Sequence, residues 1–317
     1  MGCNHKPELC RRAYQGEEDY RRIREFLGQV SLLNDRHMFS WPVFRLDYWR
    51  WHGILNLGDG CLETDVNLWE TKDQQIAAVL NPEEKGQVYL QVHPSFKSPE
   101  LEEEMVAYAE DHLRAANRRG GQVMWIWANP GDSQRQAILE QRGYVPIHEA
   151  IEHHWRRSLE QAIPERSICE GYVIHPLRDI NELPSRAWAS WRAFHPQEPD
   201  EKYDADWSWY QNIQSAPLYR RDLDLVAVGP AGEIAAFATV WYDDETQSGY
   251  FEPIGTVPEH QRKGLASALM SEGLRCLKAT GATLAIVVGG TLHANGLYQS
   301  IMGPEFDLSL PWEKRWN

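Results

Sequence analysis

The amino-acid sequence predicts a mixed α/β (α+β) fold built from two tandem domains. The chain has 317 residues, and a domain usually holds about 100–200 residues. Short sequence matches also recur at nearly one spacing along the chain. Finally, the second half places a predicted strand meander before alternating strands and helices, an order that is typical of a mixed sheet flanked by helices.

The repeat has a period of about 160 residues, with individual spacings of 158, 159 and 164 residues in one order. Self-similarity at a fixed period indicates duplication of a structural unit. We therefore expect domains at 1–160 and 161–317, joined near 157–169. The matched pairs are Gln75-Ile76-Ala77-Ala78-Val79 with Glu233-Ile234-Ala235-Ala236-Phe237, Asp47-Tyr48-Trp49-Arg50-Trp51 with Asp206-Trp207-Ser208-Trp209-Tyr210, and His93-Pro94 with Val257-Pro258.

The predicted elements follow from hydrophobic spacing and turn residues. Segment 17–33 has apolar residues at helical spacing, and its counterpart lies near 179–194. In the second copy, 223–228 and 234–242 form a predicted hairpin around Pro230-Ala231-Gly232. A strand at 249–257, a helix at 264–280, a strand at 284–288 and a helix at 292–302 complete the order.

Composition narrows the classes of partner. The net charge is −14, so a broad basic face for nucleic acid is not expected. No run approaches the roughly 20 apolar residues of a membrane span, and the first residues lack the apolar core of a signal peptide. The five cysteines, Cys3, Cys10, Cys61, Cys169 and Cys276, show neither a CxxC pair nor zinc spacing. We therefore expect a reduced, cytoplasmic setting without a metal.

The sharpest local signal is the turn Gln261-Arg262-Lys263-Gly264-Leu265-Ala266-Ser267 between a predicted strand and helix. The first N–H groups of a helix lack internal partners and carry partial positive charge, which suits an anion. Gly264 permits close backbone approach, and Arg262 and Lys263 add charge. An ordinary capped helix after a loop is the alternative interpretation.

The pattern Gln261-x-x-Gly264-x-Ala266 after a Val-Pro strand end resembles the Q/R-x-x-G-x-G/A signature of the GNAT family of acyl-CoA N-acyltransferases. The match covers about residues 224–303, and the repeat extends it to a tandem-GNAT arrangement similar to that of mycothiol synthase. The resemblance implies mixed, mostly antiparallel sheets and acetyl-CoA as co-substrate. It implies that Arg262, Lys263, Gly264, Leu265, Ala266 and Ser267 hold the pyrophosphate, and that Gln261 also belongs to the cofactor site. It further implies that the backbone of Ile254 and Val257 pairs with the pantetheine arm.

Amide formation from a thioester requires removal of an amine proton, stabilisation of the carbonyl oxygen and protonation of the leaving thiolate. The resemblance implies Tyr298 as the acid, because the family's acid is the Tyr of a Leu-Tyr pair, matched by Leu297-Tyr298. Glu252 is the candidate base, and His260 is a lesser one. We expect the Val257 N–H to stabilise the oxygen. Thr291 stands where many members have an Asn, so its contact with the cofactor departs from the family pattern.

The first copy lacks the corresponding groups. A shift of 164 residues aligns Gly264 with Glu100 and Ala266 with Glu102, which places carboxylates where an anion would bind. The expected acid position becomes Leu139. We interpret this copy as a structural partner without cofactor; its segment Tyr48-Trp49-Arg50-Trp51 either lines an acceptor pocket or only completes a core.

We expect a small-molecule primary amine as acceptor, attacked directly in the C-terminal domain, with peptide amines as a less favoured option. Acids beside aromatics in 195–210 suit an ammonium group, although a solvated acidic loop fits equally. The alternative function is a non-catalytic acyl-CoA-binding or sensor module. The sequence fits a monomer or a homodimer.

Overall fold

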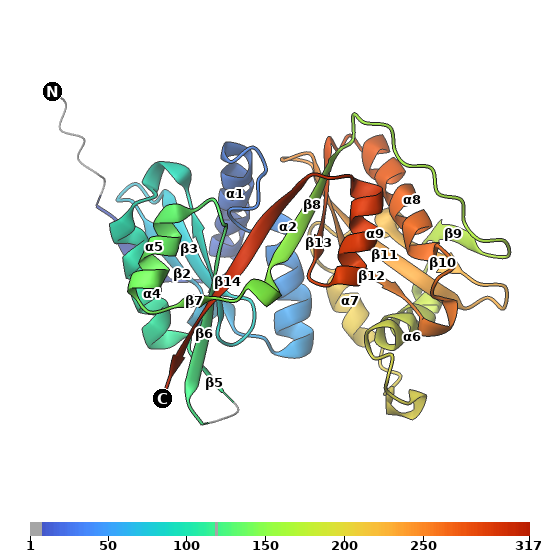
Figure 1. Cartoon of the computed structure of the whole chain (residues 1–317), viewed down its shortest axis with the longest axis horizontal. Coiled ribbons are helices and arrows are strands. Elements are labelled where there is room, and N and C mark those ends of the chain that lie inside the picture. Colours follow the sequence, from blue (N-terminus) through green and yellow to red (C-terminus); the bar gives the residue numbers. More distant parts are fainter. Residues whose placement is uncertain (1–7, 118–119) are drawn as a thin grey trace. The chain divides into compact units, whose positions relative to one another are not determined.

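A computed structural model describes residues 8–117 and 120–317; Cys3 and the start of the chain lie outside these residues. The chain divides into two compact units (Figure 1). Unit 1 comprises Met1–Glu152 and Asp307–Asn317, and unit 2 comprises His153–Phe306. The units differ from the expected division at 160 and 161 in two segments: residues 153–160 belong with unit 2, and 307–317 belong with unit 1.

Unit 1 contains a sheet with helices on its faces. The buried side chains of α4 and α5 form one core with strands of the sheet, including Met105, Leu139, Leu80 and Ile126. The strands are β1 (Cys10–Ala13), β2 (Asn67–Glu70), β3 (Ile76–Pro82), β4 (Gln87–Val92), β5 (Ala115–Ala116), β6 (Gln122–Ala128), β7 (Val145–Pro146) and β14 (Phe306–Trp316). The helices are α1 (Glu17–Leu33), α2 (Val43–Tyr48), α3 (Leu62–Asp65), α4 (Pro99–His112) and α5 (Ser133–Gln141), with short turns η2 (Pro94–Phe96) and η3 (His148–Ala150).

The strand order in unit 1 is β1-β2-β3-β4-β6-β14, with β5 beside β6 and β7 beside β14. Strands β4 and β6 run parallel, while the other pairs are antiparallel. Helix α2 continues directly into a π-helix, η1 (Trp49–Leu57).

Unit 2 repeats this plan. Its strands are β8 (Glu152–Ser158), β9 (Val173–Pro176), β10 (Asp224–Val228), β11 (Ile234–Asp243), β12 (Ser248–Thr256) and β13 (Leu284–Gly289). Its helices are α6 (Leu183–Phe194), α7 (Ser208–Gln214), α8 (Leu265–Ala279) and α9 (Leu292–Met302), with short turns η4 (Ile180–Glu182), η5 (Asp200–Lys202), η6 (Arg221–Leu223) and η7 (Pro258–His260). The expected hairpin, strands and helices of the second copy are all present.

The strand order in unit 2 is β8-β13-β12-β11-β10-β9, and only β12 and β13 run parallel. Alternation along β11 separates the two faces of the sheet. Ala236, Ala238 and Val240 pack in the core with α8, whereas Phe237 contacts Arg186 and Phe194 of α6. Helices α8 and α9 therefore cover one face and α6 the other (Figure 1).

The predicted mixed α/β architecture with mostly antiparallel sheets is confirmed. The last strand of each sequence copy pairs with a strand of the other copy: β8 pairs with β13, and β14 pairs with β6. None of the helices in the described part of the chain has the length and apolarity needed to cross a membrane.

Candidate active site

The parallel strands β12 and β13 separate halfway along their length. They pair from Ser248 with Leu284 to Phe251 with Val287. Beyond this point β12 continues to Thr256 paired with β11, while β13 continues to Gly289 paired with β8. The backbone of β12 after Phe251 therefore has an edge that no described strand covers.

A bulge marks the point of separation. Between the pairs Val240 with Phe251 and Ala238 with Ile254, β12 contains one residue more than β11. A bulge of this kind re-aims the side chains of the longer strand. Trp241, which is fully buried, donates its indole N–H to the carbonyl of Glu252 at 2.6 Å. The expected base thus lies on the bulge, with its carbonyl fixed by β11.

The structure corrects the role expected for Val257. Its N–H donates to the carbonyl of Ala235 at 2.9 Å, and its own carbonyl accepts from the N–H of His260 at 2.9 Å. Both backbone groups are thus engaged within the chain. Neither the expected pairing of Val257 with pantetheine nor its expected stabilisation of the carbonyl oxygen fits this geometry.

The open edge belongs to Ile254 and Thr256 instead. Alternate residues of an antiparallel strand direct their backbone groups to opposite sides. Since Val257 faces β11, Ile254 and Thr256 face away from it. The Gln261 side-chain amide donates to the Thr256 carbonyl at 3.3 Å. Gln261 therefore contacts the open edge of β12. The sequence alone missed Thr256, because only the register shows which residues face the edge.

Helix α8 begins without a side-chain cap. Its first residue follows Gly264, which has φ of 73° and ψ of 9°, a left-handed conformation that glycine adopts at little cost. A Cβ placed on Gly264 would meet no atom within 4 Å. Leu265 is buried, whereas Ala266 and Ser267 are half-buried and small. The N–H groups of this first turn are therefore open to an anion, and the residues present fit a pyrophosphate.

The side chain of Lys263 is held beside this turn. Its Nζ donates to the Tyr172 hydroxyl at 2.7 Å. The same hydroxyl lies 2.8 Å from Nδ1 of His260, whose Nε2 is 3.5 Å from Glu233. His260 thus belongs to a network around the helix start rather than to the pair formed by Glu252 and Tyr298. Arg262 precedes this lysine with φ of 62°.

Tyr298 lies on α9, and Glu252 lies on β12 where this strand leaves β13. Helix α9 packs closely over the end of β13, because a Cβ on Gly289 would lie 3.1 Å from the Tyr298 ring and 2.2 Å from Asn295. Burial, and next the negative charge of Glu252, raise the pKa of Tyr298 to about 12. Tyr298 therefore keeps its proton at neutral pH. The charge of Glu252 is thus felt at the Tyr298 hydroxyl.

Thr291 caps the start of α9. It is the N-cap of α9, where its hydroxyl accepts from the N–H of Ala294 at 3.2 Å. At the position where the family pattern has an Asn, Thr291 thus caps the helix that carries Tyr298.

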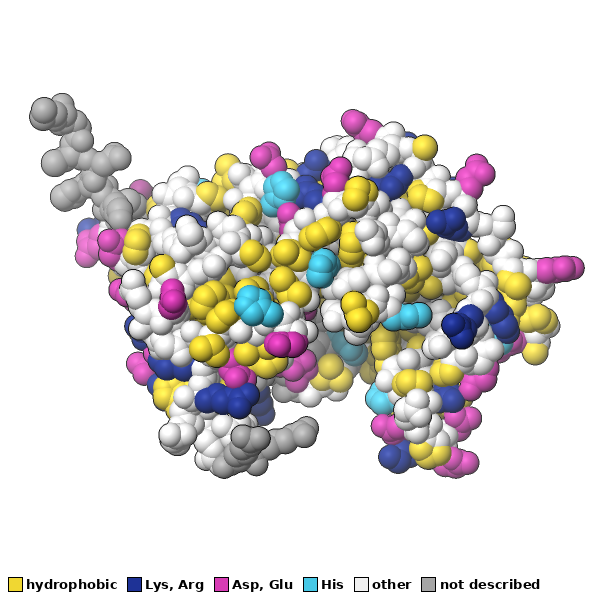
Figure 2. All heavy atoms as spheres, in the orientation of Figure 1, with side chains coloured by type: hydrophobic (Ala, Val, Ile, Leu, Met, Phe, Trp, Pro, Cys, Tyr) yellow, Lys and Arg dark blue, Asp and Glu magenta, His cyan; other side chains and the backbone are white. Residues whose placement is uncertain are grey.

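Aromatic side chains of α6 lie beside the segment after this helix, which carries acidic side chains. Trp188, Trp191 and Tyr203 pack with ring centroids 5.3–5.5 Å apart. Around them, Asp200, Glu201, Asp204 and Asp206 are exposed. Acidic side chains are visible on the loop that protrudes below α6 (Figure 2). The three rings therefore pack against one another.

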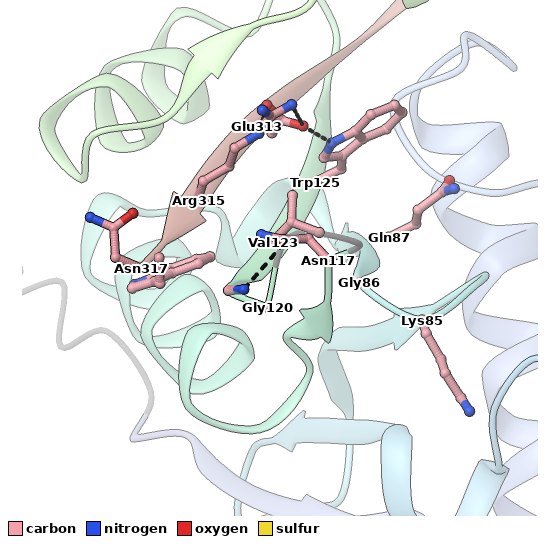
Figure 3. A pocket seen from close by; sticks show the side chains of 12 residues that line it. Lys85, Gly86, Gln87, Asn117, Gly120, Val123, Trp125, Glu313, Arg315 and Asn317 are labelled. Carbon is pink, nitrogen blue, oxygen red and sulfur yellow. Dashed lines mark hydrogen bonds and ion pairs between the residues drawn. The ribbon is translucent and has the colours of Figure 1, made fainter.

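Unit 1 also contains a cavity, of about 700 Å³, at the ends of β6 and β14 (Figure 3). Glu313 accepts from the indole of Trp125 at 2.9 Å and pairs with Arg315 at 2.7 Å. Lys85 points away from these groups. The cavity contains none of the expected site residues.

Comparisons with known proteins agree with this geometry. Residues 180–303 match the acetyltransferase (GNAT) family. The chain is 23% identical over 269 residues to a mycothiol acetyltransferase from Pseudarthrobacter chlorophenolicus, which covers 78% of this chain and 72% of that protein.

Solved structures show the same fold over nearly the whole chain. A GCN5-related N-acetyltransferase from Sphaerobacter thermophilus has a TM-score of 0.66 at 19% identity, over 97% of this chain and 95% of that one. A tandem GNAT protein from the clavulanic acid biosynthesis pathway has a TM-score of 0.62 at 13% identity, over 97% and 98%. Residues 180–303 of the chain are thus similar to the acetyltransferase (GNAT) family, and both solved structures share the fold of the chain.

Proposed function

We propose that unit 2 transfers the acetyl group of acetyl-CoA directly to the primary amine of a small molecule. One observation carries this proposal: the uncapped start of α8, the open edge of β12 and the pair Glu252 and Tyr298 occur together in this unit. Each of the three features serves a different part of the reaction. Their combination favours an enzyme over a module that only binds the cofactor.

The start of α8 fits the diphosphate of the cofactor. The N–H groups of Leu265, Ala266 and Ser267 would bind its oxygens, with Arg262 and Lys263 adding positive charge. The open edge at Ile254 and Thr256 would pair with the amides of the pantetheine arm, as an added strand does. Gln261 would act through the Thr256 carbonyl that it contacts.

The chemistry requires two proton transfers. Glu252 would take the proton of the attacking amine, directly or through one water, and Tyr298 would give its proton to the departing sulfur. Bound acetyl-CoA supplies a thioester carbonyl as the electrophile. The hydroxyl of Tyr298 suits this task because burial and the nearby carboxylate keep it protonated.

The acceptor is expected to carry an ammonium group near the amine that reacts. Support comes from the acidic segment 198–206, which extends from the helix facing Phe237 of the sheet. Small amines remain the first class to test and peptide amines the second. We propose that unit 1 binds no cofactor, because the corresponding helix start is occupied by its own side chains.

The test is a thiol-release assay with acetyl-CoA and a panel of small amines and short peptides. We expect turnover with at least one amine. Tyr298→Phe should lower kcat about 100-fold, within the usual range for a general acid, while the acetyl-CoA affinity measured by calorimetry changes less than about twofold. Glu252→Gln should also lower kcat, and Tyr242→Phe on β11 is the control.

Two outcomes would contradict the proposal. Binding of acetyl-CoA without thiol release for any amine would favour the sensor function. Unchanged kcat in Tyr298→Phe would remove this residue as the acid.

A further inference from the structure

Arg192, in the last turn of α6, contacts two segments that are far apart in the sequence. One is the segment 195–200, which leaves α6 toward the acidic loop. The other is η7, the turn between β12 and Gly264. The Arg192 side chain is only 14% exposed, although both segments lie at the surface.

The first set of contacts fixes the segment after the helix. Nη1 of Arg192 donates to the carbonyls of His195 at 3.3 Å, Pro196 at 3.1 Å and Glu198 at 3.5 Å. Its Nε lies 3.6 Å from a carboxylate oxygen of Asp200. One guanidinium thus spans the whole segment from the end of α6 to η5.

The second contact reaches the proposed cofactor turn. Nη2 donates to Glu259 at 2.9 Å. Glu259 stands in η7, beside His260, which joins Tyr172 and thereby Lys263. The hydrogen bond from its own N–H, and then the guanidinium, hold the pKa of Glu259 below its ordinary value. Glu259 is therefore a carboxylate at neutral pH.

We propose that Arg192 is a positioning residue that couples the cofactor turn to the segment 195–200. Binding of acetyl-CoA would then order this segment, which leads into the acidic segment 198–206. This inference rests on the proposed function. Its physical basis is the planar guanidinium, whose N–H groups are fixed relative to one another. A shift of Glu259 therefore moves the groups that bind to Nη1 and Nε.

The expected coupling is modest. Glu259 is 57% exposed, and ion pairs of exposed groups change equilibria by about one- to fivefold. An amide-resolved measurement is better suited than turnover to detect an effect of this size. The segment supplies its own reporters, because the N–H groups of Glu198, Lys202 and Tyr203 donate to His195, Pro199 and Asp200.

The experiment measures hydrogen exchange of these three amides in the full chain, with and without saturating acetyl-CoA. In the wild type we expect acetyl-CoA to slow their exchange about threefold. Glu259→Gln should remove this slowing, while the acetyl-CoA affinity from calorimetry stays within about twofold. Arg192→Lys should behave like Glu259→Gln, because one ammonium cannot replace the planar fork.

The control is Glu272→Gln, which breaks the ion pair with Arg275 on α8 and should leave the slowing unchanged. The inference is overturned if wild-type protein binds acetyl-CoA without slowing exchange, or if Glu259→Gln retains the full slowing. Absence of binding heat in the wild type would instead overturn the proposed function, on which the inference rests, so the two failures are distinguishable.

Discussion

Helices α4 and α8 occupy equivalent places in the element order of their units but differ in the groups that face their N-termini. Each follows a short turn that starts with proline, η2 at Pro94 and η7 at Pro258. The residue before each proline donates its N–H to a neighbouring strand at 2.9 Å: His93 to Ala77, and Val257 to Ala235. The duplicated backbone is thus visible in equivalent hydrogen bonds.

The α4 start is closed by its own side chains. Ser98 caps the N–H of Leu101 at 3.3 Å, and Pro99 offers no N–H. Glu102, which is fully buried, accepts from Nε of Arg135 at 2.9 Å. By contrast, α8 has Gly264 at its N-cap and no side-chain cap. A few side chains at the helix start therefore decide whether its N–H groups are covered or open to an anion.

The parallel strands repeat this contrast. In unit 1, pairing of β4 and β6 ends at Val88 and Ile126. The next residue of each strand, Tyr89 and Trp127, carries a ring, and the two rings stack 5.7 Å apart at 8°. In unit 2 the corresponding place on β12 holds Glu252. Aromatic packing fills the separation in unit 1, whereas a carboxylate stands there in unit 2.

The largest expected effect comes from removing the buried carboxylate at the start of α4. Glu102→Ala removes the main partner of the buried Arg135 guanidinium, and loss of one partner of such a pair costs about 3–5 kcal/mol. We expect urea unfolding of the full chain to shift accordingly. Glu103→Ala, at an exposed position of the same helix, is the control. A change below about 1 kcal/mol would show that Glu102 is not a structural group.

The second prediction closes the α8 start. Gly264→Glu adds a carboxylate and places a non-glycine residue at φ of 73°, so acetyl-CoA affinity should fall more than about 100-fold, since strain and charge repulsion add. Isothermal calorimetry measures the loss. The reciprocal change, Glu100→Gly, should create no second site, because Ser98, Pro99 and Glu102 remain. A stoichiometry of two acetyl-CoA per chain would contradict the comparison.

A smaller change sharpens the role of the turn. Tyr172→Phe removes the hydroxyl that Lys263 and His260 share. The lysine then loses one of the contacts that position it, and we expect the dissociation constant of acetyl-CoA to rise about three- to tenfold, the net effect of one ordinary hydrogen bond. Tyr242→Phe serves as the matched control. Equal affinity in Tyr172→Phe would show that Lys263 is positioned by other contacts.

The smallest expected effect is an absence of change with pH. Because the pKa of Tyr298 is raised to about 12, its acid function is lost only as pH rises toward that value. The rate constant kcat should therefore show no alkaline decline between pH 8 and 10. A decline with an apparent pKa near the ordinary tyrosine value of about 10 would contradict the raised pKa of Tyr298.

Local sequence patterns were sufficient for most elements of unit 2. Helix α9 begins and ends at the expected residues, Leu292 and Met302, because hydrophobic spacing and a threonine cap are local signals. The turn at Gly264 was equally readable, since it depends on adjacent residues. The placement of β14 was missed, because the partner of a strand depends on residues far away in the sequence.

The candidate site divides in the same way. Gly264, Lys263 and Tyr298 could be selected from the sequence, while Thr256, Trp241 and Tyr172 could not. The error at Val257 has a simple cause: a one-residue difference in register reverses the side to which a backbone N–H points. Neither the bulge nor the register is encoded in adjacent residues.

The repeat, the order of elements in unit 2 and the glycine turn before α8 can all be read from the sequence. The strand partners of β8 and β14, and the backbone groups of β12 that face its open edge, are known only from the folded chain. The physical reason is that helix starts and turns are stabilised by neighbours along the chain. Strand partners, register and the pKa of a buried group instead depend on residues brought together only by folding.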